Sequence, residues 1–206
     1  MGCDIHLYCE YKPKTGKRNG WISGDYFKVN QNHGIYDDES RMEMIELYDG
    51  RWYELFAILA DVRNYSDNIP ICQPKGIPED SCDFIKTEYE EWSCDAHSAS
   101  YFTLRELLDA EQNYKTSKRS GMISAKQYED LQNGIKPQSW CQWTNVGNYV
   151  HAEWEEDINV LDAVIKPLTE RARELFKIWD FYKDEDVKQK INQISNDIRI
   201  VFWFDN

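Results

Sequence analysis

Two short segments carry the residues of this chain that are best suited to chemistry. Asp4 and His6 stand two positions apart near the start of the sequence, and Asp95 and His97 repeat that spacing in a chain with only 4 histidines. On a strand, residues two positions apart point to the same side. Carboxylate oxygens and imidazole nitrogens together suit zinc, manganese or iron. We therefore expect the two segments to meet around one divalent metal such as zinc or manganese.

Each segment also has a simpler explanation. An aspartate beside a catalytic histidine can fix the tautomer of the ring without any metal. Equally, His97 and the serines that follow it can be loop residues that bind one another. Because the repeated pattern is short, both alternatives stay open beside the metal site.

Ser98 and Ser100 extend the second segment toward a predicted helix. Thr103 and Glu106 have the spacing of a capping box, which places the start of a helix just after the two serines. Hydroxyl groups and free backbone N–H groups at a helix start can bind an anion. Ser98 and Ser100 are therefore candidate substrate-binding residues.

A hydrolase that used His97 would also need a cation to hold an oxyanion or a phosphate. Arg63, which follows Asp61 at the end of a predicted helix, is the candidate for this role. Asp61, Arg63 and His97 are thus the candidate catalytic residues, and either Asp61 or Asp205 would orient a ligand. An ion pair at the helix end is the simpler alternative for Arg63.

Three tryptophans, Trp140, Trp143 and Trp154, lie close together in the sequence. Aromatic rings can stack on a base or a nucleotide, so Trp143 is a third candidate for substrate binding. Most such rings pack in a core, and the sequence leaves this alternative open.

Hydrophobic periodicity predicts the elements that must position these residues. Residues 2–10 alternate, with apolar side chains at odd positions and with Asp4, His6 and Glu10 at even ones. Residues 198–204 are nearly all β-branched or aromatic, which predicts a central strand buried on both faces. Helical patterns cover residues 51–64, 103–114, 124–133 and 155–182, the last interrupted at Pro167, and a shorter helix contains Val187, Ile191 and Ile194.

These elements predict an α+β (mixed α/β) fold. The N- and C-terminal strands would share a central sheet that packs against several helices. At 206 residues the chain is expected to form a single domain, with a variable insertion at about 109–150. The Pro- and Gly-rich residues 65–82 predict a long irregular loop, and such loops often carry function.

The charge of the chain restricts its partners. The net charge is -13, with 24 Lys and Arg against 37 Asp and Glu, which argues against broad binding to nucleic acid. No apolar run approaches the length of a membrane span, and no secretory signal is visible. The 6 cysteines include no C-x-x-C pair and are expected to be reduced thiols. We therefore expect a cytoplasmic protein that does not bind a membrane.

Several blocks of the sequence resemble a group of small proteins encoded by bacteriophages and prophages. The blocks are the opening MGCDIH, the helix YELFAILADVRN, the loop PKGIPED, the segment DAHSASYFTLREL and the closing RIVFWFDN. The resemblance implies a phage origin and expression in the cytoplasm of a bacterial host. Phage accessory proteins frequently act on nucleotides or disarm host defences, and both stay open here.

Three functions follow from these features. The first is a metal-assisted hydrolase, in which the metal activates water against a phosphoryl or glycosidic bond of a nucleotide or another phosphate-containing substrate. The second is a non-catalytic, anti-CRISPR-like protein that binds and blocks a bacterial immune component, with carboxylates that imitate a nucleic-acid backbone. The third is a sponge that binds nucleotides through its tryptophans. The paired segments favour the enzyme, whereas the net charge favours the blocking protein.

Overall fold

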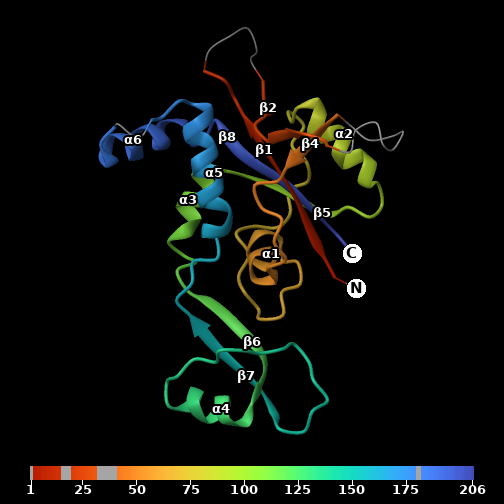
Figure 1. Cartoon of the computed structure of the whole chain (residues 1–206), viewed down its shortest axis with the longest axis vertical. Helices are drawn as coiled ribbons and strands as arrows, with labels where there is room; N and C mark the ends of the chain where they lie inside the picture. The colour runs from red at the N-terminus through yellow and green to blue at the C-terminus, as the bar shows by residue number, and fades with distance from the viewer. Residues whose placement is uncertain (1, 15–19, 32–40, 180–181) are drawn as a thin grey trace. The chain divides into compact units, whose positions relative to one another are not determined.

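The first and last strands of the chain pair along their whole length. The computed structural model describes residues 2–14, 20–31, 41–179 and 182–206. In it, β1 (Asp4–Tyr11) runs antiparallel to β8 (Ile198–Asp205). β2 (Ile22–Ser23) pairs with the other edge of β1, and β5 (His97–Thr103) pairs with the other edge of β8. The sheet order is β2-β1-β8-β5, and this central sheet flanked by helices confirms the predicted α+β class (Figure 1).

β8 lies in the middle of the sheet because its sequence is apolar on both faces. Every residue from Ile198 to Phe204 is buried, as expected for a strand that is covered on each side. The prediction of a central strand buried on both faces is confirmed. Arg199 is the single charged residue within this run and is only 4% exposed. A charge buried this deeply requires a partner, and Arg199 pairs with Glu10 of β1.

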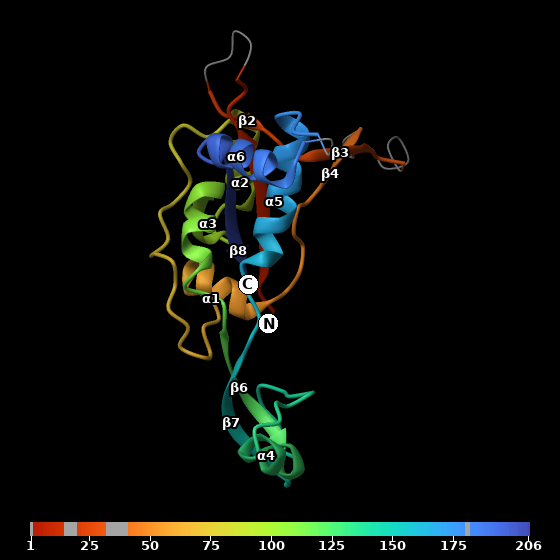
Figure 2. The same cartoon turned by 90° about the vertical axis from the view of Figure 1, so that its left-hand side faces the viewer.

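Helices cover both faces of the central sheet. Residues that pair directly across β1 and β8 share a face. On one face, Tyr8 and Trp203 pack with Ile85 of helix α2 (Asp83–Trp92). Helix α5 (Asp162–Leu175) lies on the opposite side of the sheet from α2 (Figure 2). Consequently His6 and Tyr8, at even positions of β1, face α2, whereas the side chain of Asp4 at the start of the strand is half exposed.

The contacts of the chain divide it into two compact units. The first unit contains Met1–Arg51, Gln73–Ala110 and Leu161–Asn206, and the second contains Trp52–Cys72 and Glu111–Val160. The central sheet belongs to the first unit. The variable insertion expected at about 109–150 falls mostly in the second unit. The second unit also includes residues 52–72, which no sequence pattern connects to the insertion.

The first unit contains four further elements. They are β3 (Tyr26–Val29), β4 (Met42–Ile45), α3 (Leu104–Glu111) and α6 (Asp184–Ile194). β3 and β4 form a separate two-stranded sheet. The capping box predicted for α3 is confirmed, because Thr103 donates its N–H to Glu106 at 2.7 Å and the hydroxyl of Thr103 accepts the N–H of Glu106 at 3.1 Å. Within the described ranges, no helix combines the length and the apolar composition needed to cross a membrane.

The second unit is built around an antiparallel ribbon. Its elements are α1 (Tyr53–Ala60), β6 (Ser117–Ser124), α4 (Ala125–Gln132) and β7 (Tyr149–Glu156). β6 pairs with β7 along all eight residues. One face of the ribbon buries Ile123, Ala152 and Trp154, while the side chains at alternate positions of β7 are exposed. The predicted start of α4 is confirmed by a capping box between Ser124 and Gln127.

Two predicted helices are shorter in the structure. The pattern at 51–64 forms a helix only over α1, which ends where Asp61 adopts a left-handed conformation. The pattern at 155–182 begins in β7, and among its described residues the long helix is limited to α5, with Pro167 inside it. The sequence also gave no indication of β5, since HSASYFT has no clear alternation of apolar and polar residues.

Candidate functional site

His6 lies beside Asp205 at the end of the β1–β8 pair. The Nε2 atom of His6 is 3.4 Å from a carboxylate oxygen of Asp205, and 15% and 22% of the two side chains are exposed. The register brings them together because Asp205 pairs with Asp4, two residues before His6. The other oxygen of Asp205 accepts the backbone N–H of Asp4 at 3.1 Å. Asp205 is therefore positioned to orient the His6 ring.

Asp4 is engaged by an arginine that the sequence analysis did not single out. Arg51 donates from Nε and Nη2 to the two carboxylate oxygens of Asp4 at 2.8 and 2.6 Å. A bidentate pair of this kind uses both oxygens of the carboxylate. A metal ion at Asp4 would therefore have to displace Arg51.

Aromatic rings enclose the His6 side chain. The ring centres of His6 and Trp92 are 3.9 Å apart, and that of Trp203 lies 6.0 Å away. The Nε2 atom is shielded from solvent and makes no hydrogen bond within the described part of the chain. His6 thus takes part in the packing between α2 and the sheet as well as in the contact with Asp205.

The two histidines predicted to share a metal lie on opposite faces of the central sheet. His6 pairs with Trp203, whereas His97 pairs with Phe204, the next residue of β8. Successive residues of a strand point to opposite faces. The two imidazole rings are therefore directed to different sides of the sheet.

A bulge in β5 decides the face on which His97 lies. The pairing of β5 with β8 is regular from Ser100 onward and shifts by one residue between His97 and Ser100. Ser98, inside the shifted stretch, has a φ of 50°. An unshifted ladder would direct His97 to the same face as His6, because a slip of one residue reverses the face. His97 instead places Nδ1 3.1 Å from the hydroxyl oxygen of Ser98.

The predicted convergence of Asp4, His6, Asp95 and His97 is contradicted by this register. Asp95 is exposed in the turn before β5. Among the residues that the structure describes, no group of three or more His, Cys, Asp or Glu side chains is arranged to hold a metal ion. The residue types suit a metal, but the strand register does not bring them to one point.

Ser98 and Ser100 belong to a strand rather than to a loop before a helix. Ser100 is fully buried, and its hydroxyl accepts the backbone N–H of Lys75 at 3.3 Å. The hydroxyl of Ser98 lies beside His97. Both hydroxyls have a partner inside the fold, and the anion pocket predicted from them stays a prediction.

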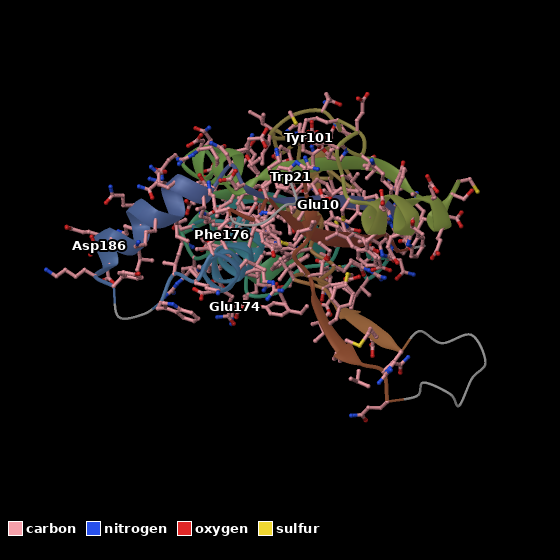
Figure 3. The ribbon with its side chains drawn as sticks, turned by 90° about the horizontal axis from the view of Figure 1, so that it is seen from above. Glu10, Trp21, Tyr101, Glu174, Phe176 and Asp186 are labelled. Carbon is pink, nitrogen blue, oxygen red and sulfur yellow. The ribbon has the colours of Figure 1, made fainter. Side chains whose placement is uncertain are left out.

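A buried ion pair occupies the even face of β1 further along the strand. Glu10 is fully buried and accepts from Nε of Arg199 at 2.7 Å and from the N–H of Cys82 at 2.6 Å. The guanidinium of Arg199 lies 3.9 Å from the ring centre of Trp21 and 5.6 Å from that of Tyr101, and Figure 3 shows Glu10, Trp21 and Tyr101 gathered in the same part of the unit. The sequence offered one signal for this pair, a lone arginine in an otherwise apolar strand.

Two carboxyl groups of the first unit titrate near neutral pH. Asp25 accepts the N–H of Cys9 at 2.7 Å and the hydroxyl of Ser23 at 3.0 Å. Burial raises the pKa of Asp25 to about 7. Burial, together with the charges of Asp49 and Asp25, raises the pKa of Glu46 to about 7 as well. Both groups therefore change charge within the physiological range.

In the second unit, Asp61 and Arg63 lie in a tight loop after α1. Their φ angles are 59° and 51°. The side chain of Asn64 donates to the carboxylate of Asp61 at 2.7 Å and to the carbonyl of Asn68 at 2.7 Å. Because Asp61 and Arg63 belong to the second unit and His97 to the first, their joint role in catalysis stays a prediction.

Residues 133–150, here named the charge-poor segment, expose large apolar side chains. Lys136 is their only charged residue, in a chain with 30% charged residues, and it pairs with Asp157 at 3.1 Å. The exposed apolar residues are Ile135, Trp140, Trp143, Val146, Tyr149 and Val150. Trp143 is 76% exposed, whereas Trp154 is 7% exposed and belongs to the core. The tryptophan group of the sequence thus divides between surface and core.

The chain shows no similarity to proteins of known family, function or structure. Comparisons with protein-family models, with curated proteins and with solved structures each found no match. In the first unit, the side chains of Asp4, His6 and His97 contact other residues of the fold. In the second unit, the charge-poor segment exposes large apolar side chains.

Proposed function

We propose that the chain is a non-catalytic binding protein that docks on a protein partner through the charge-poor segment. The partner we propose is a component of a bacterial defence system, which the chain would bind and block. The observation that carries the proposal is the exposure of six large apolar side chains in a segment with one charged residue. The centres of protein interfaces are depleted in charge and enriched in aromatic residues. Exposed apolar patches on folded chains mark interaction sites.

The chemistry of the segment favours a protein over a nucleic acid. Binding to a phosphate backbone requires available Lys or Arg side chains, and Lys136 is already paired with Asp157. The net charge of -13 also opposes a polyanion. Trp143 and Tyr149 are residue types that dominate the energetics of protein interfaces.

The remaining surface charge suggests the character of the partner. With 37 Asp and Glu against 24 Lys and Arg, the chain attracts basic surfaces over a range of about 10 Å at moderate salt. A partner with an apolar centre and a basic surround would match both features. Proteins that bind nucleic acid have such basic surfaces, and bacterial defence components include them.

The candidate catalytic groups of the first unit support a binding function. Asp4 is held by Arg51, His6 lies among aromatic rings, and His97 approaches Ser98. Each group has a partner inside the fold that accounts for its position.

A matched pair of substitutions tests the docking proposal. Trp143→Asp changes a residue of the charge-poor segment that is 76% exposed, and Ile69→Asp changes a residue elsewhere in the same unit that is 77% exposed. The wild-type protein, produced in bacteria that carry a defined defence system, is expected to restore phage plating and to bind a purified component of that system. Trp143→Asp is expected to weaken binding at least about tenfold, and Ile69→Asp is expected to leave it unchanged. Equal effects of the two substitutions, or no binding by the wild-type protein, would refute the proposal.

A hydrolase is the second candidate, and the contact between His6 and Asp205 favours it. The carboxylate of Asp205 is 3.4 Å from Nε2 without the geometry of a hydrogen bond. A small rotation of the ring would form that bond and fix its tautomer, so that the other nitrogen could accept a proton from water. The substrate class would be a nucleotide or another phosphate-containing compound, as the sequence predicts. Turnover of such substrates, with and without added zinc or manganese, should disappear in His6→Gln and fall in Asp205→Asn. Activity that survives His6→Gln would exclude this site.

A further inference from the structure

The strand β7 has an outer edge that no other strand covers. β6 and β7 form a two-stranded sheet of their own (Figure 1), and the whole of the second unit lies within the described residues. The outer edge of β6 is partly used, because Met122 and Cys141 exchange backbone hydrogen bonds of 2.7 and 3.2 Å. At the outer edge of β7, no backbone hydrogen bond is formed with any described residue.

The register of the ribbon identifies the backbone groups of β7 that point outward. In an antiparallel pair, residues that exchange hydrogen bonds alternate with residues whose N–H and C=O groups point away from the partner strand. Met122 directs its own groups to Cys141, so its pair with His151 is not hydrogen-bonded. The outward-pointing positions of β7 are therefore the odd ones, which are Tyr149, His151, Glu153 and Glu155. Such an edge is a template for another strand.

The same positions have exposed side chains. They lie on one face of the ribbon, opposite the face on which Ala152 and Trp154 are buried. Tyr149 is 41% exposed. Glu153 and Glu155 are exposed and make no ion pair or hydrogen bond with any described residue. β7 thus offers unpaired main-chain groups and unpaired carboxylates to another chain.

The edge of β7 lacks the usual protection against strand addition. Lysine, proline, a bulge or a covering segment protects most sheet edges. The strand YVHAEWEE contains neither lysine nor proline, and its pairing with β6 runs through all eight residues without a shift. Its glutamates do oppose a second copy of the chain, because like charges directly opposite one another are destabilising. A basic strand would be attracted instead.

A hollow beside this edge can accept a long basic side chain. It measures about 210 Å³, and Glu153, Glu155 and Lys118 line it. Arg119 also lines the hollow but is paired with Glu54 at 2.6 Å. The two unpaired carboxylates therefore outnumber the one unpaired lysine, and the hollow attracts a cation.

We propose that β7 accepts an extended strand of the protein partner in which basic residues alternate with apolar ones. The basic residues lie directly opposite Glu153 and Glu155, and the apolar residues lie on the other face beside Val150, which is 36% exposed. Main-chain hydrogen bonds supply affinity in such a complex, and alternate side chains supply specificity. This inference rests on the proposed docking function and names the chemistry of its partner. The charge-poor segment runs directly into this edge, since Tyr149 and Val150 begin β7.

Titration of the full chain with a synthetic peptide is the direct test. The probe is a capped peptide of about seven residues in which lysine alternates with valine. It is expected to bind saturably at one site per chain, and the same peptide with glutamate in place of lysine should bind at least about tenfold more weakly. Absence of saturable binding by the lysine peptide would refute the proposal.

Backbone methylation of the peptide separates strand addition from simple charge attraction. The lysines lie opposite the outward-pointing residues of β7, so their N–H groups face the strand. Methylation of the lysine backbone nitrogens should abolish binding, whereas methylation of the valine backbone nitrogens should preserve it. Both peptides keep their charge. Equal affinity of the two methylated peptides would show that the backbone of β7 is not used.

Substitutions locate the peptide at β7. Glu153→Gln combined with Glu155→Gln should weaken binding of the lysine peptide at least about tenfold. The matched control, Glu91→Gln combined with Glu129→Gln, removes two exposed carboxylates outside β7 and should leave the affinity within about twofold. Equal affinities in the two double variants would overturn the assignment.

A proline at the edge tests the main chain of the protein itself. His151→Pro removes an outward N–H and keeps both glutamates, and proline is tolerated where its nitrogen faces away from the ladder. Binding of the lysine peptide should be lost. Thermal unfolding establishes that the variant is folded, and if it is not, the two methylated peptides decide the question. A folded His151→Pro variant that binds the peptide normally would exclude strand addition.

Failure of this inference differs from failure of the docking function. If a defence component binds and Trp143→Asp weakens it, but the lysine peptide does not bind, docking stands and strand addition is wrong. If the peptide binds at β7 but no defence component binds, the docking function is wrong and the edge remains a site for a basic strand. A dimer in sedimentation that His151→Pro dissociates would assign the edge to a second copy and overturn the proposal.

Discussion

The central sheet of the first unit and the charge-poor segment of the second use the same residue types in opposite ways. In the sheet, Trp203 is fully buried, and Arg199 lies 4% exposed against Glu10. In the segment, Trp143 is 76% exposed and Lys136 is the only charge. The aromatic and charged groups of the sheet thus satisfy one another, whereas the segment leaves its aromatic groups open to other molecules. This contrast is why binding is assigned to the second unit even though the residues most suggestive of chemistry lie in the first.

Replacement of Arg199 tests how far the central sheet depends on its buried ion pair with Glu10. It has the largest expected effect on stability. Arg199→Met leaves the fully buried Glu10 without its ion-pair partner. Breaking a buried pair by removing one member costs about 3–5 kcal/mol. The free energy of unfolding, measured in urea at neutral pH, is expected to fall by that amount.

Two variants control this measurement. Arg51→Met removes a pair with Asp4 in which about half of each side chain is exposed, so it should cost less than about 1 kcal/mol. Glu10→Gln, added to Arg199→Met, removes the unpaired charge and should recover part of the loss. If Arg199→Met costs no more than Arg51→Met, the sheet does not depend on its buried charges.

Gly121→Ala tests how closely Trp140 packs against β6 and has the next largest effect. The added methyl would meet Trp140 and the backbone of Cys141, and overpacking of this kind costs about 1–3 kcal/mol. Displacement of Trp140 should also change the tryptophan fluorescence. Gly147→Ala is the matched control, because no atom lies within 4 Å of the added carbon. Equal results for the two variants would show that Trp140 is not held against β6.

The parts of the fold that were predicted correctly are those that local sequence determines. β1 and β8 follow from alternation and from a run of apolar residues, and the capping boxes at Thr103 and Ser124 follow from hydrogen bonds that span three residues. β5 was missed because its residues neither alternate clearly nor form an apolar run. Tertiary pairing with β8, rather than intrinsic propensity, makes it a strand.

The candidate site was harder to predict because register and contact depend on residues far apart in the sequence. His97 was expected on the face of His6, and a one-residue bulge near Ser98 places it on the other face. Arg199 could have been noticed, because a charge within an apolar strand always needs a partner.

The first unit contains buried carboxyl groups, and these should make its stability depend on pH. Burial raises the pKa of Asp25 to about 7, above its ordinary value of about 3.9. The folded state therefore retains a proton that the unfolded state has lost, so stability is full below about pH 4 and falls as the pH rises through 7. Asp25→Asn should reduce the loss of unfolding free energy between pH 5 and pH 8 by on the order of 1 kcal/mol. Glu46→Gln should act in the same direction.

An exposed carboxylate provides the control for this measurement. Asp186→Asn, at the start of α6, is expected to leave the difference between the two pH values as in the wild-type protein. Urea denaturation at both values measures all three variants. A wild-type protein that is more stable at pH 8 than at pH 5 would contradict the raised pKa of Asp25.

Trp143→Ser has the smallest expected effect on stability, and for that reason it separates the two regions most clearly. A side chain that is 76% exposed contributes little to the core, so the free energy of unfolding should change by less than about 0.5 kcal/mol. Trp203→Ala, at a fully buried position of the sheet, should cost about 3–5 kcal/mol. If Trp143→Ser instead destabilises the protein by more than about 1 kcal/mol, its indole belongs to the packing of the second unit, and the docking surface loses its centre. A small change in stability combined with a large loss of partner binding is the result that only an interaction surface produces.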